Sequence, residues 1–188
     1  MYKYITIITS TLLIQSNVLA EPLPEYWSQH NQEHYESGRD YNIKKNGSYS
    51  AYITSRTTTP KGSGEVWQAV GDCYFPNNKA KLSVFLKTSN VTGVAGVIFK
   101  IVTPTQIIQD RMKSRELSGN NSWKKYYSIM KIPSDCIQMS IGFSLEGMGT
   151  VYADDFKISK AKSNSEESSS VEVFENIRTK LENLGFEN

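Results

Sequence analysis

The sequence has only two histidines, His30 and His34, among its 188 residues. A Ser-His-Asp or Cys-His arrangement would therefore have to use one of them. The chain also lacks a G-x-S-x-G nucleophile elbow and a phosphate-cradling glycine loop of the Walker type. The 19 Asp and Glu residues leave a carboxylate pair for glycoside cleavage open, because such pairing is spatial. These absences favour a protein that binds its ligand without transforming it, and we expect no enzyme.

The two histidines do form one pattern with catalytic meaning. Residues 30–34 read His-Asn-Gln-Glu-His, which is H-x-x-E-H, typical of inverted zinc peptidases. On a helix, the two imidazoles would share a zinc ion and Glu33 would act as the base. No supporting helical pattern follows, so a zinc hydrolase is a remote alternative to an exposed polar segment.

Long apolar runs are absent after residue 20. Before it, one lysine precedes the apolar run 5–14, and Val18-Leu19-Ala20 has small residues at the positions that a signal peptidase reads. The run is shorter than the roughly 20 residues of a membrane-spanning helix. We therefore expect a signal peptide at 1–20, no membrane span after its removal, and a secreted or periplasmic protein.

An excess of either charge is also missing. Lys3 is the only charge in the expected signal peptide, so residues 21–188 carry 20 basic and 19 acidic residues. A nucleic-acid-binding protein normally shows a basic excess gathered on one face or helix. The balance predicts no nucleic-acid partner.

Cysteine is scarce, with Cys73 and Cys136 the only two. An exported chain usually meets an oxidising compartment, so we expect them to form a disulfide that ties two distant loops. Two buried thiols remain the alternative, because sequence does not give the distance between their Cα atoms.

The remaining sequence is rich in strand patterns, and none of them before residue 168 is helical. In 137–145, Ile, Met, Ile, Phe and Leu alternate with Gln, Ser, Gly and Ser, which predicts a strand with one buried face. Connectors rich in Gly, Pro and Asn separate the runs. We predict an all-β fold, a two-sheet antiparallel jelly-roll sandwich over 41–159 with 21–40 as an extended lead-in. The eight predicted strands are 49–55, 65–70, 81–88, 96–103, 106–111, 123–132, 137–145 and 150–158.

Beyond the sandwich the composition changes abruptly. Residues 160–170 are rich in Ser, Lys and Glu, which predicts a flexible linker. A capping-box pattern then precedes an amphipathic stripe, so we predict a short helix at 171–185. Such a helix must dock on its own sandwich, on a second copy or on a protein partner. The stripe consists of Val171, Phe174, Ile177, Leu181 and Leu184.

The stretch from about 35 to 158 resembles the galactose-binding-like jelly-roll domains, which include carbohydrate-binding modules of secreted glycoside hydrolases. The matching segments include GSYSAYI (47–53), VWQAV (66–70), LSVFLKT (82–88), AGVIFKI (95–101), WKKY (123–126) and GTVYADDFKI (149–158). The resemblance implies the fold and, by analogy, a carbohydrate or another extracellular ligand. A protein-interaction or assembly module that uses the C-terminal helix is the alternative.

The same resemblance suggests one metal. In similar sandwiches an aspartate of the last strand helps to hold a structural calcium ion, so Asp154 or Asp155 is a candidate ligand and calcium a possible cofactor. Neighbouring residues of a strand face opposite ways, so only one of the two is expected to reach the ion.

Sugars are held by aromatic faces and flanking hydrogen-bonding side chains. Trp123 occupies a position that the resembling family uses for core packing, whereas Trp67 is a candidate platform or a core residue. We expect polar and aromatic side chains of one concave sheet to accompany Trp67, and a solvated sheet face would explain them equally well. The candidate ligand-binding residues are Trp67, Lys87, Lys100, Asp110, Arg111 and Tyr127.

Overall fold

The computed structural model describes residues 21–71 and 73–175, and within them the regular structure consists of strands alone. No described segment forms a helix of the length and hydropathy that a membrane crossing needs. The expected signal peptide lies outside the described residues. The strands are β1 (Trp27–His30), β2 (Tyr35–Asp40), β3 (Ser50–Ser55), β4 (Ser63–Val70), β5 (Lys79–Val102), β6 (Gln106–Asp110), β7 (Leu117–Lys131), β8 (Gln138–Glu146), β9 (Thr150–Lys160) and β10 (Val171–Glu175).

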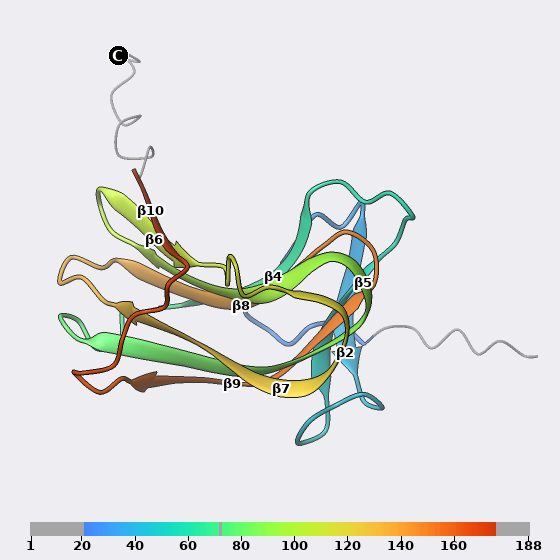
Figure 1. Cartoon of the computed structure of the whole chain (residues 1–188), viewed down its shortest axis with the longest axis horizontal. Coiled ribbons are helices and arrows are strands. Elements are labelled where there is room, and N and C mark those ends of the chain that lie inside the picture. The colour runs from blue at the N-terminus through green and yellow to red at the C-terminus, as the bar shows by residue number, and fades with distance from the viewer. Residues whose placement is uncertain (1–20, 72, 176–188) are drawn as a thin grey trace, which may run out of the picture.

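The strands form two stacked antiparallel layers that share β5. The first half of β5 pairs with β7 and β9. Strand β9 also pairs with β3, which pairs with β2. We call this layer sheet I. The second half of β5 pairs with β6 on one side and β8 on the other. Strand β6 pairs with β10, and β8 pairs with β4, which pairs with β1. We call this layer sheet II. Figure 1 shows β4, β6, β8 and β10 in one layer and β7 and β9 in the other. The predicted antiparallel sandwich is confirmed.

All eight predicted strands are present, but two of them are halves of one strand. Residues 90–93, expected to form a turn, lie inside β5, where its pairing with β7 shifts register. Asn90 has a φ of 53°, and a Cβ on Gly93 would lie 2.3 Å from the Glu146 carbonyl oxygen. These residues bend the strand without ending it, so β5 leaves sheet I and enters sheet II.

The core lies between the layers and is built by alternation. Inward-facing side chains of the two halves of β5 and of β8 are almost all fully buried, because each strand turns every second residue inward. The largest fully buried side chains of the core are Tyr35 of β2, Phe99 of β5 and Phe143 of β8, each with 0% exposure. The expected lead-in 21–40 is part of the sandwich, since β1 and β2 extend the two sheets and Tyr35 enters the core.

The two cysteines are bonded. Cys73 lies between β4 and β5 and Cys136 between β7 and β8, with 6.0 Å between their Cα atoms and a sequence separation of 63. The bond joins two loops that are distant in the chain, as the sequence predicted.

The Ser-rich segment packs along the edge of the sandwich and is not a free linker. Ser168 exchanges hydrogen bonds with Ile129, since its N–H donates to the carbonyl of Ile129 at 2.9 Å and its hydroxyl accepts from the amide of Ile129 at 2.9 Å. Lys79 Nζ donates to the carbonyl oxygen of Ser165 at 2.7 Å. The prediction of a flexible linker is wrong for these residues, because backbone and hydroxyl groups provide the contacts that the missing apolar side chains do not.

The predicted helix begins as a strand instead. Val171–Glu175 forms β10, which pairs with β6 in antiparallel register, with Val171 opposite Asp110 and Glu175 opposite Gln106. The open edge of β6 offers unpaired backbone N–H and C=O groups. Hydrogen bonding to them stabilises the strand by more than a helix of five residues would be stabilised. Ile177, Leu181 and Leu184 lie outside the described residues.

Asp110 anchors this edge from inside the sandwich. Its side chain has 0% exposure, and its Oδ1 accepts hydrogen bonds from Ser170 Oγ at 2.6 Å and the Met112 amide at 2.8 Å. Arg115 Nη2 donates to Asp110 Oδ2 at 2.8 Å and to Ser170 Oγ at 2.9 Å. Burial opposes ionisation, but the hydrogen bonds and the Arg115 charge together hold the pKa of Asp110 below its usual value.

We expect Asp110→Ala to lower the free energy of unfolding by about 3–5 kcal/mol, because it leaves the Arg115 cation without its buried partner. Urea denaturation measures the change, and Asp135→Ala, at an exposed site, should change it by less than about 0.5 kcal/mol. Since the native pKa of Asp110 is depressed, this contribution is complete above the ordinary pKa of 3.8 and is lost as the pH falls through the native value. Equal urea midpoints for the two variants would contradict the anchoring role.

We expect Cys73→Ser/Cys136→Ser to lower the free energy of unfolding by about 4 kcal/mol, the chain-entropy value for closing a loop of this length. Urea denaturation of the variant measures the loss, with the unaltered protein in the presence of reductant as a second route to the same state. A double variant as stable as the oxidised protein would refute the stabilising role.

Candidate functional site

The outer face of sheet II is hollowed along β8. The inward side chains of β8 are large and apolar, whereas the outward ones are Gln138, Ser140, Gly142 and Ser144. Gly142 lies opposite Trp67 of β4, and a Cβ there would lie 2.2 Å from the Val66 carbonyl oxygen and 2.8 Å from Trp67 Cβ. The small residues therefore form a floor between strands that carry larger side chains. From Gln138 to Ser144 this floor is about 20 Å long.

Strands β4 and β6 supply the two walls of the resulting groove. Trp67 and Glu65 project from β4, and Ile107, Gln109 and Arg111 project from β6 and the residue after it. The groove has a volume of about 320 Å³, within the range of small-ligand sites.

An ion pair closes one end of the groove. Arg111 Nη2 lies 2.6 Å from Glu65 Oε1, which also accepts a hydrogen bond from Ser63 Oγ at 3.1 Å. Because β8 and β5 lie between β4 and β6, this pair reaches across the small residues Ser144 and Gly96. It holds both walls at a fixed separation.

Three polar side chains in the groove are available to a ligand. Lys100 lies opposite Ser140 on β8 and Gln109 on β6, and Gln138 lies in the next row, opposite Val102. Within the described part of the chain, the Lys100 ammonium and the side-chain amides of Gln109 and Gln138 make no hydrogen bond or ion pair. Their positions beside the Trp67 ring combine an aromatic face with donors and acceptors.

Strand β10 extends the same face. In its register with β6, Glu172 lies opposite Gln109 and Phe174 opposite Ile107, so both side chains lie on the groove side of the sheet. Phe174 is 45% exposed, and Glu172 accepts a hydrogen bond from Lys113 Nζ at 2.8 Å. The C-terminal strand thereby adds a second aromatic ring to the face.

The candidate ligand-binding residues fall into three places. Trp67, Lys100 and Arg111 line the groove, so the interpretation of Trp67 as a core residue is wrong. Asp110 faces the interior, and Lys87 and Tyr127 lie on the outer face of sheet I. The expectation that all six share one concave sheet is wrong, because β5 changes sheets between Lys87 and Lys100.

Sequence reasoning missed the groove residues Gln109 and Gln138, and it did not place Phe174 on the same face of the sheet. The polar half of the alternation in 137–145 was a usable signal for Gln138, since it marks the outward face of β8. Nothing in the local pattern indicated that β4 and β5 flank this strand or that β6 lies beyond β5.

The other two tryptophans are not groove residues. Trp27 packs against the core, with its ring centroid 5.2 Å from that of Phe156. Trp123, expected in the core, is half-buried on β7 and does not belong to the core cluster.

The H-x-x-E-H segment does not have the geometry of a zinc site. His30 ends β1 and residues 32–34 form a turn, so the two imidazoles are not one helical turn apart. Among the described residues no group of three or more His, Cys, Asp or Glu side chains could hold a metal ion.

Asp154 and Asp155 both face the loop that precedes β3, contrary to the expectation that they point to opposite sides. Asp155 has a φ of 59° and lies at a bulge of β9, which turns the chain by one residue. Asp154 Oδ2 accepts the backbone N–H groups of Lys45 and Asn46 at 2.8 and 2.9 Å, and Asp155 Oδ2 accepts Asn46 Nδ2 at 3.2 Å. These partners are N–H donors, whereas calcium takes oxygen ligands, so the surroundings do not fit a calcium site.

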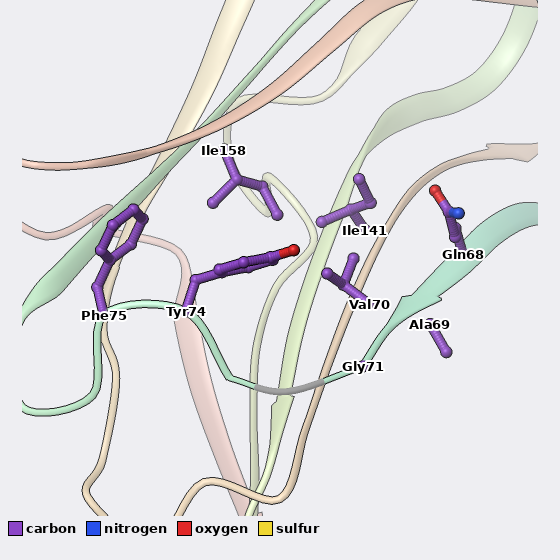
Figure 2. A pocket seen from close by; sticks show the side chains of 8 residues that line it. All are labelled: Gln68, Ala69, Val70, Gly71, Tyr74, Phe75, Ile141 and Ile158. Atoms are coloured by element: carbon purple, nitrogen blue, oxygen red, sulfur yellow. The ribbon is translucent and has the colours of Figure 1, made fainter.

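A second pocket, of about 530 Å³, lies at the end of the sandwich beside the disulfide. Figure 2 shows the Tyr74 ring projecting toward Val70 and Ile141, with Ile158 above the ring and Phe75 on the side away from Val70. Gln68 contributes an amide, but the other lining side chains are apolar or aromatic. This lining offers a sugar fewer hydrogen-bonding partners than the groove does.

Comparison with curated proteins gives one partial relative. The chain is 28% identical over 126 residues to the uncharacterized HTH-type transcriptional regulator YbfP of Bacillus subtilis (strain 168). The matched region is 64% of this chain and 42% of the regulator. The chain thus spans less than half the length of that relative. No family model matches the chain.

Solved structures with similar folds include both binding modules and enzymes. The CBM22-1 and GH10 modules of Clostridium thermocellum xylanase 10B, complexed with xylohexaose, give a TM-score of 0.53 at 14% identity over 77% of this chain and 27% of that one. The CBM22-1 xylan-binding domain of Paenibacillus barcinonensis Xyn10C gives a TM-score of 0.51 at 13% identity, and the match covers 76% of this chain and 90% of that domain. A cyclase from Fischerella sp. TAU gives a TM-score of 0.54 at 13% identity, and the match covers 78% of this chain and 89% of the cyclase. At these identities the likeness concerns the fold, and the chain has the galactose-binding-like jelly-roll fold found in carbohydrate-binding modules.

Proposed function

We propose that this protein is an exported, non-catalytic domain that binds an extended neutral carbohydrate in the groove of sheet II. The observation that carries the proposal is the combination of Trp67 with the unpaired Lys100, Gln109 and Gln138 side chains around a floor of small residues. Sugar C–H groups pack on an aromatic face, and their hydroxyls need hydrogen-bonding partners. The groove offers both in one place.

The shape of the groove supports an oligosaccharide over a single sugar. Its floor extends along β8 for about 20 Å, and Phe174 of β10 lies at the edge of the sheet in the row of Gln138 and Ile107. The Glu65–Arg111 pair closes the opposite end. A chain of sugars would therefore run along β8 from this pair toward the row of Gln138, whose outer end is Phe174.

Binding without catalysis fits the side chains of the groove. Glu65 is the one carboxylate that lines the groove within the described residues and is paired with Arg111, and Glu172 on the same face is paired with Lys113. Glycoside cleavage uses two carboxyl groups on either side of the scissile bond. Export is supported by the signal-like N-terminus and by a disulfide, which persists in oxidising compartments.

We expect Trp67→Ala to raise the Kd for a bound oligosaccharide by about 10- to 100-fold, because it removes the stacking surface of the groove. A glycan array identifies the bound sugars, with xylohexaose as the first soluble ligand, and calorimetric titration measures the Kd. Tyr127→Ala, which removes an exposed ring from sheet I, is the matched control and should leave the Kd unchanged. Unchanged binding in Trp67→Ala, or no binding to any neutral glycan, would refute the proposal.

We further propose that Asp154 and Asp155 hold the loop before β3 without calcium. Neither calcium chloride nor a chelator should shift the Tm, whereas Asp154→Ala should lower stability by about 1–3 kcal/mol by leaving two backbone N–H groups without their acceptor. Differential scanning calorimetry measures both effects. A Tm that rises with calcium and falls with chelator would establish a metal site instead.

A further inference from the structure

The outer face of sheet I carries a strip of lysines and aromatic rings. Along β5 the outward residues are Lys81, Ser83, Phe85 and Lys87, since Leu82, Val84 and Leu86 face the core. Ser83 lies opposite Tyr127 of β7 and Lys157 of β9, and Phe85 lies opposite Lys125 and Asp154. Lys45 reaches the same face from the loop before β3. We call the set of Lys45, Lys81, Lys87, Lys125 and Lys157 with Phe85 and Tyr127 the lysine strip.

Aromatic rings, and not carboxylates, accompany these ammonium groups. Lys45 Nζ and Lys125 Nζ lie 5.2 and 4.7 Å from the centroid of the Phe85 ring, and Lys81 Nζ lies 4.5 Å from that of Tyr127. None of the five lysines forms an ion pair with a described residue. A ring stabilises a cation without neutralising its charge. The strip therefore keeps its positive charge.

The acidic residues lie elsewhere, apart from the aspartates at the β9 bulge. Asp154 lies in the row of Phe85 and, with Asp155, offsets part of the charge of the five lysines, although its Oδ2 is occupied by two backbone N–H groups. Glu36 and Asp40 belong to β2, at the edge of sheet I, where Glu36 accepts a hydrogen bond from Tyr52 and Asp40 lies near Tyr152, which separates it from Lys87. Glu116, Glu146 and Glu172 lie beside the groove of sheet II. A chain whose charges nearly balance thus carries a concentrated positive field on one face.

We propose that the lysine strip is a second binding surface, for an acidic polysaccharide, on the layer opposite the groove. Alternating ammonium groups and aromatic rings match a polymer whose sugar rings alternate with negatively charged groups. Arginine is the residue best suited to bidentate phosphate recognition, and Arg115, which donates to the Tyr127 carbonyl oxygen, is paired with the buried Asp110. The free cations of the strip are lysines, which favours a carboxylate polymer over a nucleic acid. Phe85 is half-buried in the sheet beneath two ammonium groups, so it cannot insert into a lipid bilayer.

The test titrates residues 21–188, with the disulfide formed, with polygalacturonate. We expect binding that weakens as sodium chloride is raised, because exposed charges are screened. Lys81→Gln/Lys125→Gln should raise the Kd about ten-fold, as expected for the loss of two exposed ion pairs. Lys61→Gln/Lys162→Gln removes the same net charge from exposed positions outside the strip and should leave the Kd unchanged. Trp67→Ala should also bind normally, which separates this surface from the groove.

Three results would overturn the proposal. They are no binding of polygalacturonate by the unaltered protein, an equal loss in both lysine double variants, and a loss in Trp67→Ala as large as in Lys81→Gln/Lys125→Gln. Phosphatidylglycerol vesicles and a single-stranded oligonucleotide are titrated in parallel. Tighter, strip-dependent binding of either one would assign the lysines to that class of ligand and would likewise reject the polysaccharide.

Discussion

The passage of β5 from one sheet to the other is the constraint on which the rest of the structure depends. This strand hydrogen-bonds to β6, β7, β8 and β9, so it is a central strand of both layers. Its inward side chains, from Ala80 to Ile101, contribute to the core at both ends of the sandwich. Burial of this continuous apolar row fixes the stacking of the two sheets and leaves one outer face on each.

The two outer faces differ in shape and charge. The difference comes from the outward-facing residues, which alternate along each strand with the inward-facing core residues. On sheet II, small residues of β8 lie between larger side chains of β4 and β6, and the result is a groove with few charges of its own. On sheet I, the outward residues of β5, β7 and β9 include lysines and rings with no central strand of small residues. One fold therefore presents a recess with an aromatic wall, which we propose binds neutral sugars, and, on the other layer, a strip of lysines and rings.

The buried carboxylate of Asp110 connects the C-terminal segment to this arrangement. It binds Ser170 from within the sandwich, and the chain that follows pairs with β6 as β10. Because β6 is a wall of the groove, the same anchor that closes the edge of the sheet also brings Phe174 to the binding face. A polar network inside the sandwich thus influences the composition of a surface site.

The sequence by itself determined the class of fold and the bounds of β3, β4, β6, β8 and β9 to within two residues, and it predicted the disulfide between Cys73 and Cys136. These properties are local or nearly so, because strand alternation is a period-two pattern and a sole pair of cysteines has one possible partner each. It also identified Trp67, Lys100 and Arg111 among the candidate residues. The tertiary structure alone decided that Lys87 and Tyr127 belong to the other sheet, that Asp110 faces inward and that 171–175 form a strand. Those outcomes depend on where β5 bends and on which strand edge lies nearby, and neither is encoded in the hydrophobic period of the segments concerned.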